Sequence, residues 1–296
     1  MRWTRGKRSK NVQDRRFQRG AGRGRVAKGT GLGLGGIVLI LVLSLLTGED
    51  IFSLLGGGAQ LQTGPQPAGA PATGATSPEE EELVEFMHFL LDDIQEEWHQ
   101  LLPRAGANYQ DAQLILFRDA TPSACGMGQA AMGPFYCPGD RQVYIDLSFY
   151  TELARRFGAP GDFAQAYVLA HEIGHHVQTL LGIERQVREL QRSQPAMRNE
   201  YSVAMELQAD CLAGVWGYSA AQEGLLEPGD VEEGLRAAAA IGDDRIQRQT
   251  TGRVTPESWT HGSSDQRMYC SDGDSNRETL IDVIRSPKWG DPRDSG

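Results

Sequence analysis

The sequence predicts an α+β fold, in which a helix-rich domain with a small β-sheet is preceded by one N-terminal transmembrane helix. Three observations predict it. Apolar residues recur at helical spacing through most of residues 78–285, whereas only two runs, 112–119 and 142–149, are patterned as strands. Residues 31–48 contain no charged side chain, which is typical of a membrane segment. We expect the folded domain to occupy residues 78–285, followed by a polar tail at 286–296.

The first 48 residues combine a basic tail with the apolar segment. Residues 1–30 hold eleven Lys and Arg against one acidic residue, which leaves 18 basic and 38 acidic residues for the rest of the chain. Basic residues beside a membrane segment favour the cytoplasmic side. We therefore expect residues 1–30 to be a basic cytoplasmic tail, residues 31–48 to anchor the chain once in the plasma membrane, and everything after Glu49 to be extracytoplasmic. A cleaved signal peptide is the alternative, and nucleic-acid binding is not expected.

Residues 49–77 are expected to form a flexible linker, because Gly, Ala, Pro, Gln and Thr dominate them and large apolar side chains are few. Four cysteines follow, an even number that favours disulfides in an oxidising compartment. Of the three possible connectivities, Cys125 with Cys137 and Cys211 with Cys270 is the least entangled. No CxxC spacing is present, which argues against a zinc site made of thiolates.

The first helix of the domain is predicted to begin at Ser77, which is a good N-cap, and to end before Pro103. Its apolar stripe is expected to face the core, and its two histidines, His88 and His99, are expected to be structural or exposed. The residues from Gly252 onward have the composition of a loop. Further helices are expected at residues 150–157, 162–181, 183–194, 199–216 and 228–247.

The helix expected at residues 162–181 contains the sequence HEIGHHVQ. His171 and His175 are four residues apart, so their rings lie on one face and can share one zinc ion, while Glu172 can take a proton from the metal-bound water. The alternative, exposed helix histidines, conflicts with the apolar neighbours, because an unpaired His or Glu in a core is costly. His176 lies about 100° round the helix from His175 and is expected to have a packing or surface role.

A catalytic zinc ion usually has a third protein ligand and one open position. Glu206 and Asp210 are the only charged residues in the apolar stretch 203–216, and their spacing places them on one helix face. A metal contact for Glu206 and a ligand-histidine N–H for Asp210 would satisfy both carboxylates. The alternatives are ordinary polar positions, an ion pair with Arg198, or Cys211 as the ligand.

The segments HEIGHHVQ and ELQADCLAGVW resemble the bacterial neutral zinc metallopeptidase family of single-pass membrane proteins. The resemblance extends over most of the chain, through blocks at residues 11–16, 125–149, 237–249 and 260–267. It is similar in plan to gluzincins of the membrane CAAX-protease type, and it implies a zincin-like domain that binds Zn²⁺. The implied roles are metal ligand for His171, His175 and Glu206, general base for Glu172, and support of a ligand histidine for Asp210.

His261 and Arg267 lie in the segment THGSSDQR. A zinc peptidase needs hydrogen-bond donors for the oxyanion of its tetrahedral intermediate. By resemblance to related gluzincins, His261 is implied to stabilise this oxyanion and Arg267 to orient the loop. The alternative is a loop histidine satisfied by local contacts and a surface arginine.

These observations predict a membrane-anchored zinc metalloendopeptidase that hydrolyses peptides or proteins outside the cytoplasm. The strand at residues 142–147 is expected to pair with an extended peptide substrate. Two other classes stay open. One is a non-catalytic membrane-tethered binding module with a structural zinc, and the other is a deformylase-like hydrolase that uses Cys211 as a metal ligand.

Overall fold

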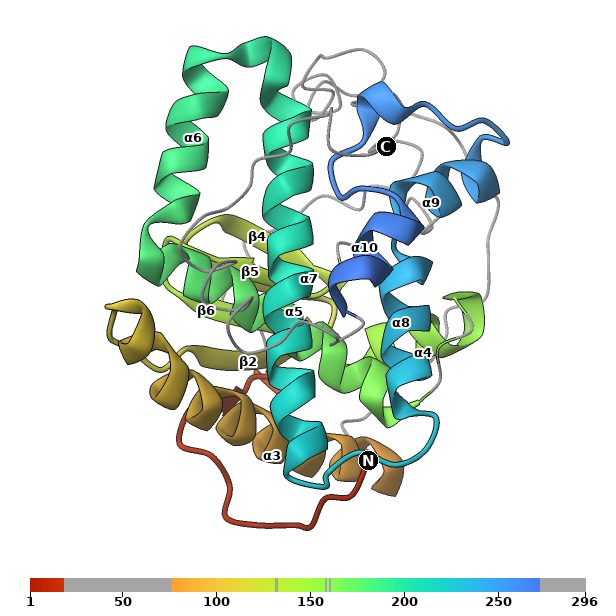
Figure 1. Cartoon of the computed structure of the whole chain (residues 1–296). Coiled ribbons are helices and arrows are strands. Elements are labelled where there is room, and N and C mark those ends of the chain that lie inside the picture. The colour runs from red at the N-terminus through yellow and green to blue at the C-terminus, as the bar shows by residue number, and fades with distance from the viewer. Residues whose placement is uncertain (19–75, 131–132, 158, 160, 272–296) are drawn as a thin grey trace, which may run out of the picture. The chain divides into compact units, whose positions relative to one another are not determined.

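The computed structural model describes residues 1–18, 76–130, 133–157, 159 and 161–271 (Figure 1). Its architecture is α+β, with many helices and two small sheets, as predicted. Within the described ranges, no helix is both long enough and apolar enough to cross a membrane. The expected membrane segment 31–48, almost all of the expected linker and the polar tail 286–296 lie outside the described residues.

The larger sheet has the strand order β1-β2-β6-β5. The two central strands, β2 (Gln113–Phe117) and β6 (Gln142–Asp146), are parallel neighbours and confirm the two strands predicted from sequence. The edge strands are β1 (Val12–Asp14), parallel to β2, and β5 (Phe135–Cys137), antiparallel to β6. A separate hairpin is formed by β3 (Ala120–Ser123) and β4 (Gly126–Gln129). The four unpredicted strands are too short to show an alternating pattern.

The first 18 residues require a correction. They were expected to belong to a basic cytoplasmic tail, but they form one compact unit with the residues that follow position 78. β1 pairs with β2, and the guanidinium of Arg16, 1% exposed, lies 2.7 Å from Asp14, 2.8 Å from Glu80 and 2.9 Å from Glu81. At least this part of the basic segment therefore serves the fold, because its charge is neutralised by acidic residues of the domain.

The helices follow the predicted order, with two differences at the C-terminal end. They are α3 (Pro78–Leu101), α4 (Ser148–Phe157), α5 (Asp162–Leu181), α6 (Ile183–Ser193), α7 (Arg198–Gln222), α8 (Asp230–Ala240), α9 (Asp243–Thr250) and α10 (Ser264–Ser271). The single helix expected at residues 228–247 is α8 and α9, because Gly242 between them is extended, with φ −66° and ψ 140°. A Cβ on Gly242 would lie 2.5 Å from the amide nitrogen of Ser264, so α10, which was expected to be loop, packs closely there.

The main core lies between one face of the larger sheet and α3, α5, α7 and α8. Leu114 and Val143, paired in the β2–β6 register, are fully buried in it. The contact between α5 and α7 is especially close, because a Cβ on Gly174 would lie only 3.0 Å from the carbonyl oxygen of Ala209. Glycine at this position lets the two predicted site helices approach. It thereby brings the residues around His171 next to those around Glu206.

The two histidines of α3 have different surroundings, and the buried Nδ1 atom of His88 has no hydrogen-bond partner among the described residues. His88 is buried in the interior side of the helix. His99 is partly exposed, and its Nε2 lies 2.7 Å from a carboxylate oxygen of Asp111. Neither residue lies in the group described below.

Candidate metal centre

His171 and His175 on α5 face Glu206 on α7. One donor atom from each of the three residues can be chosen so that all lie within 4.8 Å of one another. The Nε2 atom of His171 is 3.3 Å from one carboxylate oxygen of Glu206, and the Nε2 atom of His175 is 3.5 Å from the other. Ligands that bind Zn²⁺ tetrahedrally at about 2.1 Å are separated by about 3.4 Å. The separations between each histidine and the carboxylate are therefore compatible with a zinc ion held by the three side chains.

The second ring nitrogen of His171 fixes which nitrogen can bind a metal. Its Nδ1 lies 2.8 Å from Oδ1 of Asp210, which is fully buried. A carboxylate only accepts hydrogen bonds, so Nδ1 carries the proton and Nε2 presents its lone pair to the ion position. Asp210 thus lies where the sequence analysis expected the support of a ligand histidine.

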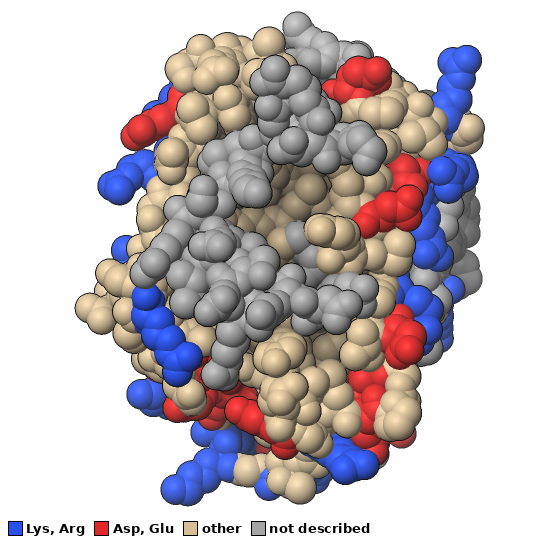
Figure 2. Space-filling view, viewed as in Figure 1, with Lys and Arg blue, Asp and Glu red and all other residues tan. Residues whose placement is uncertain are grey.

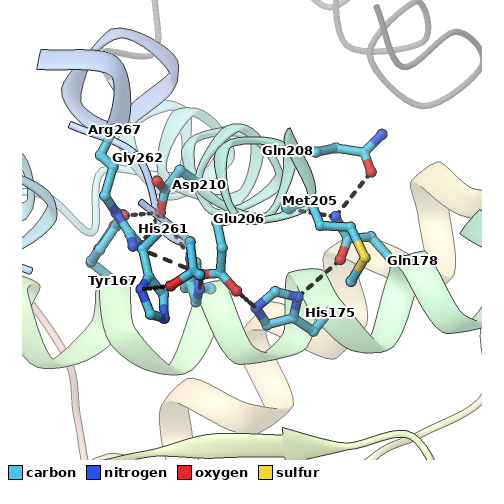
Figure 3. Close-up of polar contacts among 12 residues, drawn as sticks. Tyr167, His175, Gln178, Met205, Glu206, Gln208, Asp210, His261, Gly262 and Arg267 are labelled. Atoms are coloured by element: carbon cyan, nitrogen blue, oxygen red, sulfur yellow. Dashed lines mark hydrogen bonds and ion pairs between the residues drawn. The ribbon is translucent and has the colours of Figure 1, made fainter. Parts of the chain in front are cut away.

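The corresponding partner of His175 is Gln178, which sequence reasoning missed. The Nδ1 atom of His175 lies 2.9 Å from Oε1 of Gln178. The amide nitrogen of Gln178 donates to the carbonyl oxygen of Met205 at 2.7 Å and to Oε1 of Gln208 at 2.9 Å, which fixes the orientation of the amide (Figure 3). A neutral amide therefore does for His175 what a carboxylate does for His171. The sequence signal that could have identified Gln178 is its position as a polar side chain on the apolar side of this helix.

Replacement of Gln178 by Met should weaken zinc binding by about 10- to 100-fold, because His175 would lose the acceptor that orients its ring. Chelator competition on the purified chain measures this affinity. Gln208→Met is the matched control, since it removes the neighbouring hydrogen bond but leaves the contact between Gln178 and His175. Equal zinc affinity in a folded Gln178→Met chain and the wild type would contradict this role.

Arg267 on α10 contacts both carboxylates of α7. Its Nη2 atom donates to Oδ1 of Asp210 at 2.8 Å, and its Nη1 atom lies 3.8 Å from Glu206 (Figure 3). Tyr167 also donates its hydroxyl to Asp210. Arg267 is only 1% exposed, so the alternative of a surface arginine is wrong. It acts on the carboxylates directly.

The charges of the group favour a cation between the ligands. Burial by itself would lower the pKa of His171, but the charge and hydrogen bond of Asp210, with Glu206, raise it to about 10. Burial would raise the pKa of Glu206, but the charges of His175 and His171 hold it below its usual range. The carboxylates thus stabilise positive charge at this position, whether protons or a divalent ion carry it.

Glu172 is adjacent to the ligands without being one of the three. Its side chain is buried, and this burial raises the pKa of the carboxyl above its ordinary value, although His171 and His175 oppose the shift. The backbone N–H of Tyr136, on the edge strand β5, donates a hydrogen bond to it. A carboxylate with a raised pKa, held next to a sheet edge, suits a group that accepts and returns a proton.

His261 lies in the loop before α10, and Asp243 at the start of α9 holds that loop. One carboxylate oxygen of Asp243 accepts the backbone N–H groups of Thr260 at 2.7 Å, His261 at 2.6 Å and Gly262 at 3.1 Å. The other oxygen lies 3.3 Å from Nδ1 of His261. Burial lowers the pKa of His261, but Asp243 and the charge of Glu206 produce a net upward shift. Asp243 is a second residue that sequence reasoning missed.

His176 and Cys211 do not join the metal ligands. His176 is fully buried, and its Nε2 donates to the carbonyl oxygen of Gln110 at 2.6 Å while Nδ1 accepts from the hydroxyl of Tyr136 at 3.0 Å. This is the packing role expected for it. Cys211 is disulfide-bonded, which removes it as a thiolate ligand.

The predicted disulfide between Cys125 and Cys137 is confirmed. It joins the start of β4 to the end of β5, the edge strand that donates to Glu172. The side chain of Cys270, the expected partner of Cys211, lies outside the described residues.

The chain is similar to known proteins over most of its length. A family model described as "Putative neutral zinc metallopeptidase" matches residues 1–273. The uncharacterized protein YpfJ of Escherichia coli strain K12 is 49% identical over 269 residues, which cover 90% of this chain and 92% of that protein. An uncharacterized protein of Mycobacterium bovis, Mb2605, is 46% identical over 184 residues, or 58% of this chain and 59% of its own. No solved structure matches the chain significantly.

Proposed function

The chain belongs to the neutral zinc metallopeptidase family, and on this premise we propose that it is a zinc-dependent endopeptidase. The observation that carries the proposal is the group of His171, His175 and Glu206, whose donor atoms lie within 4.8 Å of one another beside Glu172. Among the described residues, no fourth metal-ligating side chain joins the group. Three protein ligands with one open position are typical of catalytic zinc, whereas a structural zinc usually has four.

Glu172 carries the proton transfers in this proposal. Bound zinc would supply Lewis acidity, which lowers the pKa of a water molecule toward about 7 and polarises the scissile carbonyl. The Glu172 carboxylate accepts a proton from the water as the water oxygen attacks the carbonyl carbon. It then delivers this proton to the amide nitrogen as the C–N bond breaks, so that the carboxylate is regenerated.

The strand available to a substrate is β5, which corrects the expected one. Residues 142–147 were expected to pair with the peptide, but β6 is already hydrogen-bonded to β2 on one side and to β5 on the other. β5 is the edge strand, and Tyr136 on it donates to Glu172. We propose that the substrate backbone lies along β5, because an edge strand can accept one further strand next to the proton carrier.

The full-length chain loaded with zinc should therefore hydrolyse members of a mixed peptide library. The activity should disappear on chelation and return when zinc is restored, because the Lewis acid of the proposed reaction is removed and replaced. Mass spectrometry of the products measures this. A folded chain that binds zinc but cleaves no peptide would favour the non-catalytic binding module instead.

His261 is proposed to donate to the oxyanion that forms on the scissile carbonyl. Its Nδ1 lies 3.0 Å from the hydroxyl of Thr260 and 3.3 Å from Asp243, and its side chain is about half exposed (51%), which leaves Nε2 for a bound substrate. His261→Ala should lower kcat by about 10²- to 10³-fold with a smaller effect on KM, because the oxyanion exists only in the transition state and intermediate. Steady-state kinetics at equal zinc content test this, and an unchanged kcat would exclude the role.

We retain membrane attachment through residues 31–48 as a proposal, which rests on the sequence alone, but no longer as a single crossing, because that would place its two flanks on opposite sides of the membrane. The pairing of β1 with β2 supports a revised arrangement, in which residues 1–18 share a compartment with the metal centre. The extracytoplasmic location of residues 1–18 and of the metal centre stays a proposal. The original expectation, which separated these two parts by a membrane, would require β1 to leave the sheet.

Cysteines introduced at Lys10 and Glu189, both exposed, should therefore behave alike toward a membrane-impermeant maleimide. Both should react in intact spheroplasts if the domain is extracytoplasmic, and neither should react before lysis if it is cytoplasmic. A cytoplasmic marker thiol serves as the control for membrane integrity. Labelling of the Glu189→Cys chain alone would restore the original orientation.

A further inference from the structure

A groove with a volume of about 320 Å³ opens beside the metal ligands. Its walls are α6 and α7, its inner end reaches His175 and Glu206, and β5 contributes Tyr136 and Pro138. In Figure 1, α6 and α7 stand side by side and are joined at one end, which gives the groove two long helical walls. None of the steps assigned to Glu172 and His261 uses this space.

The groove has both apolar and polar lining, and next to the ligands the hydroxyl of Thr179 lies beside three side chains that supply apolar surface. Val187 on α6 is buried, Met205 on α7 is partly buried, and both line the groove together with the ring of Tyr136. Figure 3 shows the Met205 side chain close to His175 and Gln178. A side chain that enters from the metal position can therefore contact the carbon and sulfur atoms of Val187, Met205 and Tyr136, and these contacts favour an apolar occupant.

The far end of the groove is closed. The amide nitrogen of Gln191 on α6 donates to the hydroxyl of Ser202 on α7 at 2.9 Å and to the carbonyl oxygen of Arg198 at 3.1 Å. Ser202 lies one helical turn before Glu206, so this bridge limits the groove in the direction away from the ligands. A peptide backbone cannot continue between the helices past the bridge, but a single side chain fits in front of it.

The charge at the mouth of the groove is balanced. Arg188, which is exposed, pairs with Glu184 one turn earlier on α6, and both residues line the groove. In Figure 2, charged side chains lie mainly along the outline of this face, and the described surface nearer its middle is largely uncharged. Nothing in the lining therefore selects a charged side chain over a neutral one.

The strand direction decides which substrate residue reaches this groove. β5 runs from Phe135 to Cys137, and Pro138 at its end lines the groove. A peptide that adds to β5 in the antiparallel sense, which is the more stable pairing, has its amino-terminal part at this end. We propose that the groove is a specificity pocket for one long apolar side chain, such as Leu, Met or Phe, on the amino side of the scissile bond. This inference rests on the proposed peptidase function.

The first test uses two metal-binding probes that differ only in this side chain, N-acetyl-leucine hydroxamate and N-acetyl-glycine hydroxamate. The leucine probe carries an isobutyl group on the amino side of the hydroxamate carbonyl, and the glycine probe carries only hydrogen there. The zinc-loaded full-length chain should bind the leucine probe about tenfold more tightly or better, as expected for burial of an isobutyl group. Calorimetry measures the ratio without requiring catalysis. In a Met205→Trp chain, whose indole fills the groove, the ratio should fall to about two.

A second variant keeps the test decisive if Met205→Trp fails to fold. Gln191→Ala removes the bridge at the far end, so a longer probe, N-acetyl-homophenylalanine hydroxamate, should gain several-fold in affinity while the glycine probe is unchanged. Glu189→Ala, on the exposed side of α6, is the control and should change neither probe.

Equal affinities of the leucine and glycine probes for the zinc-loaded wild type would overturn the pocket and leave the metal site intact. A preference for Leu, Met or Phe only on the carboxyl side of cleaved bonds in a peptide library would also overturn it. Failure of the proposed function is distinguishable, because it appears as a chain without zinc or without hydrolysis. Hydrolysis with an amino-side preference that is weakened in Met205→Trp supports both inferences.

Discussion

The Glu172→Gln chain should bind zinc as the wild type does and hydrolyse peptides about two to four orders of magnitude more slowly. Glutamine has nearly the same volume and keeps an acceptor oxygen for the backbone N–H of Tyr136, so the fold and the ligands should be undisturbed. It cannot accept a proton at neutral pH, and proton acceptance from water is the role proposed for residue 172. The measurement is kcat on a cleavable peptide, with zinc content determined on the same samples.

Glu189→Gln, which makes the same substitution on the exposed face of α6, is the matched control and should leave kcat unchanged. Peptidase activity within about threefold of the wild type in a zinc-loaded Glu172→Gln chain would remove Glu172 from the reaction. Loss of zinc together with activity would instead show that the residue supports the metal site. Measuring both quantities separates these two outcomes.

The sequence predicted the part of the site that depends on spacing along one helix. His171 and His175 are four residues apart in a strongly helical, apolar stretch, and the helix expected at residues 162–181 has those bounds in the structure. Glu206 and Asp210 were visible for the same reason, as two charges with helical spacing among apolar residues. Both patterns are local. Helical spacing of polar residues within one buried helix can be recognised from the sequence alone.

The residues that were missed depend on contacts between elements distant in sequence. Gln178 orients His175 only because α5 and α7 touch at Gly174, where the amide of Gln178 finds the carbonyl of Met205. Arg267 was named through the family resemblance, but its contact with Asp210, 57 positions away, was missed because it comes from a short helix that the polar sequence after Gly252 did not predict. The spacing of residues in either segment does not predict these contacts, because each contacting side chain, taken alone, is an ordinary polar residue.

The N-terminal segment shows that basic residues near an apolar run can also serve the folded domain. Its excess of Lys and Arg beside an apolar run matches the signal that orients membrane proteins. The same side chains have acidic partners within the domain: Arg16 pairs with Glu80, and Arg8 pairs with Glu85 at 2.6 Å. Charge counting cannot distinguish the two uses, because the opposite charges lie about 60 to 80 positions away along the chain. Strand β1 has only three residues, which are too few to show an alternating pattern in the sequence.

The Glu206→Ala chain should lose the approximately one zinc ion per chain expected of the wild type, because the two remaining histidines lack the anionic ligand that completes the site. Zinc content after dialysis measures this, and Glu200→Ala, an exposed position on the same helix, is the control. The full-length chain is required, since a fragment starting at residue 78 lacks β1 and the Arg16 ion pairs. Zinc retained at wild-type stoichiometry would exclude Glu206 as a ligand.

Thermal unfolding provides an independent reading of the same substitution. A ligand present at about 1,000 times its Kd stabilises the folded state by about 4 kcal/mol, so chelation should lower the Tm of the wild type by roughly 8 to 16 °C. The Tm of the Glu206→Ala chain should not respond to chelation, because no bound ion remains to be removed. If the wild-type chain contains zinc but keeps its Tm on chelation, the ion binds at a site that does not stabilise the folded state. The geometry argues against that result, because α5 and α7 supply the three donors together and hold their orientation through Asp210 and Gln178.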